Sequence, residues 1–292
     1  MALYIVVAGG APLAALLAIA SAIGAWEFYR IARAAGQTPM EDVGIAVAGL
    51  IPLVVHARFL GIQIPALPIA AVVFVAILGL AIWRRGVEGR PVGAAATTIL
   101  GAIYTGGMLS FGYALRYHPY AFADAQLGFS SSRGLREHTA TTFTVPAGAL
   151  LLMLPMLVTW ASDTGAYAVG RMMGKRKLIP SVSPGKTVEG ALGGVVASVL
   201  VAWAFGNGVL RPAAQLGFKW APWGIIAFGI AISVAAQVGD LFESLIKREA
   251  GVKDSSRILP GHGGILDRLD SMFFVLPVAF LFIQWLLTWV PR

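Results

Sequence analysis

The sequence predicts an all-α, polytopic integral membrane protein, and three observations support this fold class. Of its 292 residues, 58% are hydrophobic and only 12% are charged, whereas soluble domains carry about 25% charged residues. Apolar stretches of at least about 18 residues recur along the chain, each long enough to cross a bilayer as a helix. The cations stand in short segments between these stretches, so they are expected to set topology rather than to bind nucleic acid.

The apolar stretches predict about eight membrane-spanning helices, with nine as the alternative. Their expected ranges are 4–26, 43–61, 66–83, 93–115, 145–162, 190–206, 222–240 and 272–290. The first stretch has no basic residues before it, so we expect a retained helix with its N-terminus outside. This orientation puts the active site on the cytoplasmic side, in the inner or plasma membrane if the host is bacterial. It agrees with the positive-inside rule, because 15 of the 22 Lys and Arg fall in the inside segments 28–42, 84–91, 163–189 and 241–271.

Ionisable residues divide the chain into two predicted parts. Residues 1–144 are expected to form a transmembrane scaffold, because their spans contain few ionisable groups. Within this part, Trp26 to Arg33 is expected to form an interfacial amphipathic turn with aromatic anchors. Residues 145–292 are expected to form the catalytic region. The chain has no cysteine, which excludes thiolate catalysis, disulfides and sulfur-ligated metals.

The end of the seventh span carries a stripe of polar residues. Asp240, Glu243, Ser244 and Lys247 have the offsets 0, 3, 4 and 7, so one helix would present all four on one face. Charged groups within membrane helices usually mark a site or a pathway. The alternative is a helix end exposed to water.

The segment after this helix combines a glycine-rich turn with two acids. Pro260, Gly261, Gly263 and Gly264 interrupt helix formation around His262 and allow close approach of the backbone to a ligand. Asp267 and Asp270 stand three residues apart at the entry to the last span, so both can face one side of it. Asp267 could also cap that helix. With Asp240, these acids form a predicted oxygen-ligand site for a hard cation such as Mg2+, surrounded by Lys247, Arg248, Lys253, Arg257 and Arg268.

The segment between the fifth and sixth spans is polar and basic. Asp163 and Tyr167 lie four residues apart at the end of the fifth span. Basic residues follow with Ser183, Thr187 and several glycines, a composition that suits a polyphosphate: Arg171, Lys175, Arg176, Lys177 and Lys186. A topogenic basic loop attracted to anionic lipid is the alternative. A P-loop is excluded, because its first glycine would fall at Pro180.

The two polar segments resemble those of the phosphatidate cytidylyltransferase (CDP-diacylglycerol synthase) family. The family signature is matched by Ser244, Lys247, Arg248, Lys253, Asp254, Pro260, Gly261, His262, Gly263, Gly264, Asp267, Arg268 and Asp270. Three further blocks are similar to the family's: SDTGAY at 162–167, SPGKTVEG at 183–190 and GDLFES at 239–244. The resemblance is specific over 160–271, and before that it is confined to the pattern of spans and the EFYR stretch.

The resemblance implies transfer of CMP from CTP to phosphatidic acid, which gives CDP-diacylglycerol and pyrophosphate for phospholipid biosynthesis. It implies that Asp240 and Asp267 hold Mg2+ in a two-cation centre with Asp270 beside it, and that Ser244 and Lys247 are needed for activity. It also suggests a homodimer.

We expect the basic residues to contact the substrates' phosphates. Lys247 and Arg248 would contact the transferred phosphate, and Lys186 and Arg176 the triphosphate or the lipid headgroup. His262 would bind phosphate or hold its loop. The other expected substrate-binding residues are Asp163, Tyr167, Ser183, Thr187, Lys253 and Arg268.

The sequence leaves two rival functions open. One is another membrane enzyme that uses CTP, either a cytidylyltransferase for a different lipid phosphate or a CTP-dependent lipid kinase. The other is a secondary transporter, because intramembrane acids and broken helices also occur in transporters. The absence of an internal repeat and the gathering of charge at one membrane face oppose the transporter.

Overall fold

The structure is a computed structural model that describes residues 2–118, 147–210, 222–258, 261 and 263–283. It confirms an all-α, polytopic membrane protein, because seven helices in the described residues are long and apolar enough to cross a bilayer. The eighth predicted span, 272–290, begins as expected in helix α12 (Leu266–Phe282). Its last residues, 284–290, lie outside the described part.

The described N-terminal part contains six α-helices. They are α1 (Ala2–Ala8), α2 (Gly10–Ala34), α3 (Glu41–Phe59), α4 (Ala66–Arg85), α5 (Pro91–Ala102) and α6 (Met108–Arg116), with a π-helical turn, η1 (Ile103–Gly107), joining the last two. The single first span predicted over 4–26 is wrong: the chain breaks at Gly9, which has a φ of +67°. A Cβ at Gly9 would lie 2.6 Å from the Tyr117 hydroxyl oxygen, so glycine permits both the backbone conformation and the close contact.

The C-terminal part contains longer helices than hydropathy predicts. Helix α8 (Ala147–Met173) and helix α11 (Pro222–Glu249) continue for several turns beyond the predicted ends at 162 and 240. Between them lie α9 (Val188–Phe205) and the π-helical turn η3 (Gly206–Leu210). A hairpin of β1 (Lys177–Ile179) and β2 (Ser183–Thr187), paired antiparallel, precedes α9. The sequence predicted only a loop between α8 and α9, whereas the structure forms a hairpin that carries several of its polar residues.

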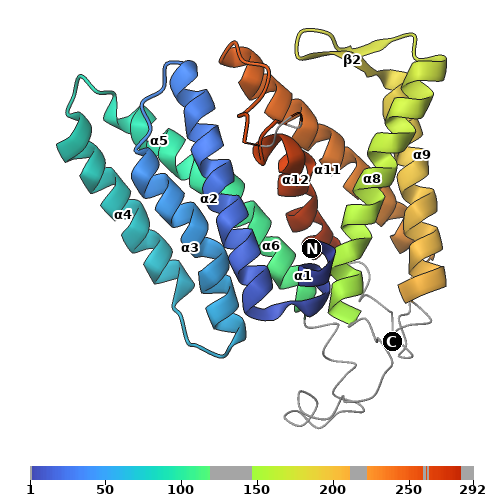
Figure 1. The fold of residues 1–292 in the computed structure, drawn as a ribbon, viewed down its shortest axis with the longest axis horizontal. Coiled ribbons are helices and arrows are strands. Elements are labelled where there is room, and N and C mark those ends of the chain that lie inside the picture. Colours follow the sequence, from blue (N-terminus) through green and yellow to red (C-terminus); the bar gives the residue numbers. More distant parts are fainter. Residues whose placement is uncertain (1, 119–146, 211–221, 259–260, 262, 284–292) are drawn as a thin grey trace.

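The helices form one assembly in which α12 lies between the N-terminal helices and helices α8 and α9. Figure 1 shows α2 to α5 on one side, α8 and α9 on the other, and α11 and α12 between them. The α2–α3 and α4–α5 connections, the hairpin and the α11–α12 segment all lie at the same end, the upper one in this view. The segments predicted to be inside therefore share one end of the molecule.

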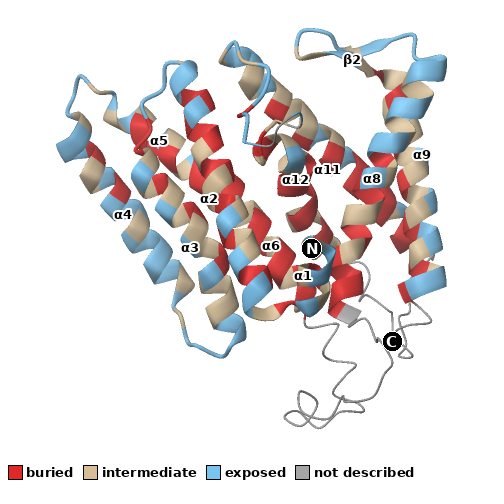
Figure 2. Ribbon diagram, viewed as in Figure 1, coloured by how far each residue is buried: buried red, intermediate tan, exposed pale blue. Residues whose placement is uncertain are grey.

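Burial separates the core from a face suited to lipid. Figure 2 shows buried residues concentrated on α2, α6, α8, α11 and α12, whereas α4 is largely exposed. The exposed side chains of α4 are apolar, among them Leu67, Val72 and Trp83, as expected for a helix in contact with lipid. The segment Trp26 to Arg33 is not a separate turn, and its location at the membrane interface stays a prediction. It continues α2, and Glu27, Phe28 and Tyr29 within it are buried.

Candidate active site

The polar stripe at the end of α11 is confirmed as one helical face with internal contacts. The Ser244 hydroxyl donates to Asp240 Oδ1 at 3.4 Å, and Lys247 Nζ lies 2.6 Å from Glu243 Oε2. Glu243 is only 1% exposed. A helix end surrounded by water would not bury a carboxylate, so the alternative of a solvated end is wrong for this residue.

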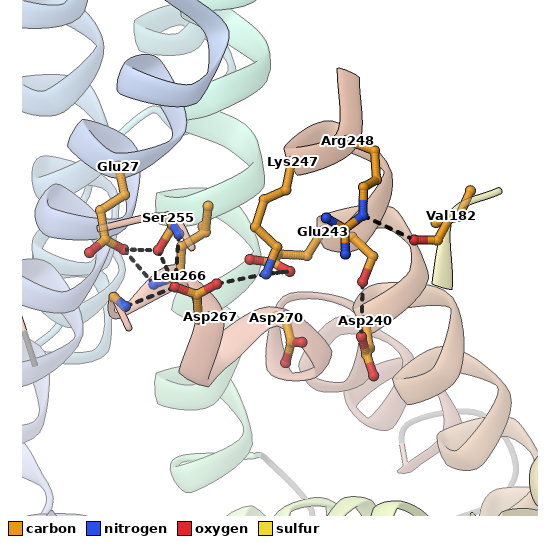
Figure 3. Close-up of polar contacts among 12 residues, drawn as sticks. Glu27, Val182, Asp240, Glu243, Lys247, Arg248, Ser255, Leu266, Asp267 and Asp270 are labelled. Carbon is orange, nitrogen blue, oxygen red and sulfur yellow. Dashed lines mark hydrogen bonds and ion pairs between the residues drawn. The ribbon is translucent and has the colours of Figure 1, made fainter. Parts of the chain in front are cut away.

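Asp267 links α11 to α12 and to the segment that precedes α12. Its Oδ1 atom accepts a hydrogen bond from Lys247 Nζ at 2.7 Å. Its Oδ2 atom accepts from the Ser255 amide at 2.9 Å, the Ser255 hydroxyl at 2.6 Å and the Gly264 amide at 2.8 Å. Lys247 thereby bridges Glu243 and Asp267 (Figure 3). The amides of Ile265 and Leu266 at the start of α12 bond instead to Glu27.

Three acids from three helices lie within electrostatic reach of one another. Asp240 is on α11, Asp270 lies before the predicted last span in the first turns of α12, and Asp163 is on α8. Figure 3 shows the carboxylates of Asp240 and Asp270 pointing the same way from their two helices. Asp270 is largely buried, and its carboxylate interacts electrostatically with those of Asp240 and Asp163. Like charges held together in this way favour a cation between them.

Lys186 connects the hairpin to these acids. Its Nζ atom lies 2.7 Å from Asp240 Oδ2, and both side chains are partly exposed. The pair lies at the wall of a pocket of about 590 Å³ between α8, β2, α9 and α11. The predicted residues that line this pocket are Asp163, Tyr167, Lys186, Thr187 and Asp240, together with Arg171. The structure therefore brings the two polar segments of the sequence to one place.

Other predicted site residues have contacts that serve the fold. Thr187 is the N-cap of α9 and accepts a hydrogen bond from the Gly190 amide at 3.1 Å. Arg176, just before β1, pairs at 3.4 Å with Glu189 in the first turn of α9. The Arg248 side chain donates to the Val182 carbonyl oxygen at 3.5 Å, which joins α11 to the hairpin. The substrate roles of all three stay predictions.

The remaining predicted residues are outside the pocket or outside the described residues. Lys253 and Arg268 are exposed, and Ser183 is half-buried at the start of β2. His262 lies outside the residues that the structure describes. Its two alternatives, phosphate binding and loop support, both stay open.

The acids fit a divalent cation only in part. Among the described residues, no group of three or more His, Asp or Glu side chains is arranged to hold a metal ion. Mg2+ usually takes just one or two protein carboxylates and completes its coordination with water and substrate phosphates. Asp240 and Asp270, whose charges interact, would supply two such carboxylates. Both oxygens of Asp267 already accept hydrogen bonds, so its role as a ligand stays a prediction.

Sequence reasoning missed two polar residues of this region. Gln237 lines the pocket one turn before Asp240 and donates to the Ala191 carbonyl oxygen at 3.2 Å. Glu27 reaches the segment before α12 from helix α2. The signal for Glu27 was present, since it is an acid within a long apolar stretch.

Comparisons with known proteins agree with the resemblance seen in the sequence. Residues 1–286 match the family described as "Cytidylyltransferase family". Relatives named "Phosphatidate cytidylyltransferase" occur in Staphylococcus saprophyticus (50% identity over 131 residues), Staphylococcus haemolyticus (48% over 134) and Staphylococcus aureus (47% over 134). Each match covers 45% of this chain and 48% of the relative, so the chain spans about half the length of the curated relatives it matches.

Proposed function

The chain belongs to the cytidylyltransferase family, and on that premise we propose that it transfers CMP from CTP to phosphatidic acid. A phosphate oxygen of the lipid attacks the α-phosphorus of CTP, the bond to the β-phosphate breaks, and CDP-diacylglycerol and pyrophosphate leave. The observation that carries this proposal is the position of Asp240. This residue pairs with Lys186 at the wall of the pocket and is a close electrostatic neighbour of Asp270. A pocket with a cationic wall thus adjoins a pair of acids.

The nucleophile needs no general base in this reaction. A phosphate monoester has a second pKa of about 6, so phosphatidate is largely a dianion at neutral pH. The barrier comes from repulsion between two anions and from charge that grows on the leaving pyrophosphate, so positioning and electrostatic stabilisation lower it. Lys186 supplies positive charge at the pocket, and Lys247 supplies it at the junction of α11 and α12. Tyr167 offers an exposed aromatic ring at the same pocket, suited to stacking on the base.

The proposed reaction uses Mg2+, which Asp240 and Asp270 would hold, with Asp267 as a further candidate ligand. A second cation could complete a two-cation centre. When bound, Mg2+ would neutralise charge on the phosphates. The relatives' name supports the choice of CTP and phosphatidate as substrates. The lipid reaches the site from the bilayer, and the site faces the cytoplasm, in keeping with the basic residues at that end. Residues 145–292 carry the chemistry, residues 1–144 form the scaffold, and two copies of the chain form a dimer.

The test is incubation of the purified protein with CTP, phosphatidate and Mg2+, followed by separation of the lipid and soluble products. CDP-diacylglycerol and pyrophosphate are the expected products. Release of CDP with a phosphorylated lipid would identify a CTP-dependent kinase and refute the proposal. Uptake of labelled substrate into vesicles without covalent change would identify a transporter.

A further inference from the structure

We propose that Glu27 is a positioning residue that fixes the segment formed by residues 255–256 and 264–266 and, through it, Asp267. The inference rests on the proposed function and extends it to a residue of the N-terminal scaffold. Glu27 is on α2, more than 220 residues away from the segment in sequence, and its side chain extends toward the start of α12 (Figure 3). It is completely buried.

The Glu27 carboxylate accepts hydrogen bonds from two backbone amides and the Ser256 hydroxyl, and it shares the single Ser255 hydroxyl proton with Asp267, which lies closer to it. The amides are those of Ile265, 3.1 Å from Oε1, and Leu266, 2.6 Å from Oε2. The Ser255 hydroxyl is 3.2 Å from Oε2, and the Ser256 hydroxyl also bonds to Oε1. Both amides stand at the N-terminus of α12, where Ile265 supplies no side-chain cap. Glu27 therefore caps α12 from another helix, at the end of the helix that favours negative charge.

Ser255 connects this carboxylate to Asp267. Its hydroxyl lies 3.2 Å from Glu27 Oε2 and 2.6 Å from Asp267 Oδ2, while its amide donates to the same Asp267 oxygen. Asp267 also accepts from the Gly264 amide. The segment is thus held between two carboxylates, and the place of Asp267 depends on donors whose own positions Glu27 sets.

Gly264 shows how closely the segment fits around Glu27. A Cβ at this position would lie 2.2 Å from Glu27 Oε1 and 2.2 Å from the Ser255 hydroxyl oxygen. No side chain can occupy that space without moving one of these groups. The second glycine of the Gly263-Gly264 pair is therefore required by the contact with Glu27.

Glutamine cannot replace Glu27 in this arrangement. Each carboxylate oxygen faces a backbone amide, which can only donate. The NH2 group of a glutamine side chain would therefore face one of these amides and leave a buried donor without an acceptor. Glu27→Gln keeps the size of the side chain, so it removes the hold on the segment with little change in packing.

The experiment compares the full-length wild-type protein, Glu27→Gln and Ser256→Ala by hydrogen exchange and by kinetics. The matched control is Glu41→Gln, which removes an exposed partner of Arg33 outside the site. For Glu27→Gln we expect faster amide exchange confined to 251–268. We also expect kcat to fall about 10- to 100-fold, the usual effect of losing a partner that orients a ligand residue. The Michaelis constant for CTP should change by less than about threefold, because Glu27 does not line the pocket.

Ser256→Ala should produce the same changes to a smaller degree, and it tests the proposal if Glu27→Gln cannot be isolated folded. Faster exchange in all helices would indicate a structural role alone and overturn the proposal, as would an unchanged kcat. If the wild-type protein made no CDP-diacylglycerol, the proposed function would fail. The exchange comparison would still show separately whether Glu27 holds the segment.

Discussion

Replacing Asp267 by asparagine removes one charge from the junction of α11 and α12 while keeping the shape of the side chain. Asp267 Oδ2 faces three donors, two of them backbone amides, and Oδ1 faces the Lys247 ammonium. The asparagine oxygen will take the place of Oδ2, because that position has more donors. Its NH2 group is then directed at Lys247, and one charge-assisted hydrogen bond is lost.

The substitution should affect both stability and turnover. The Asp267 side chain is only 12% exposed. Loss of its hydrogen bond with the charged Lys247 should therefore lower the free energy of unfolding by about 1.5–3 kcal/mol. Activity should fall further if Asp267 also helps to hold the cation. Loss of about 4 kcal/mol of transition-state stabilisation would lower turnover about 1,000-fold, at about 1.36 kcal/mol for each factor of ten.

The assay follows labelled CTP into chloroform-soluble lipid at saturating Mg2+, with thermal unfolding of each variant measured in the same detergent. The control is Asp42→Asn, which removes an exposed ion pair with Arg84 and should retain turnover. Near-normal turnover of Asp267→Asn at saturating Mg2+ would refute a cation role for Asp267. It would leave this residue as a structural link between the two helices.

Three further predictions concern the pocket, the glycine-rich turn and the cation. Lys186→Ala should raise the Michaelis constant for CTP or for lipid. It should change the free energy of unfolding by no more than about 1 kcal/mol, because the ion pair between Lys186 and Asp240 is partly exposed. Unchanged Michaelis constants would assign the hairpin to topology alone. Gly264→Ala should lower both the unfolding temperature and turnover, because its Cβ would overlap Glu27 and Ser255, and wild-type values for both would contradict the close contact. Removal of divalent cations by EDTA should abolish turnover and added Mg2+ should restore it; activity that persists in EDTA would exclude a cation role.

The fold was predictable from the sequence because the bilayer fixes the length and composition of its helices. What hydropathy could not predict was where helices end once they leave the apolar region. Asp163 and Asp240 are polar, yet helical hydrogen bonding continues through them to Met173 and Glu249. The break at Gly9 falls in Gly9-Gly10-Ala11-Pro12, a local breaker signal that hydropathy alone does not register.

The site was predictable in its parts and less so in its connections. The spacing from Asp240 to Lys247 placed these residues on one helix face, as observed. The ion pair between Lys186 and Asp240 joins a hairpin to α11, and it requires a tertiary arrangement that spacing does not encode. The contacts of Glu27 also require the tertiary arrangement, because its partners Ile265 and Leu266 lie near the other end of the sequence.

The most direct test of the account is whether acids from α11 and α12 hold a divalent cation together. Mn2+ binding to the purified protein, followed by electron paramagnetic resonance in the presence of CTP, measures this for the wild type, Asp240→Asn, Asp270→Asn and the double variant. Each single substitution should weaken Mn2+ binding at least about tenfold, and the double variant should be little worse than either, because the two residues act on one ion. Wild-type binding in the double variant would contradict the cation site on which the proposed reaction depends.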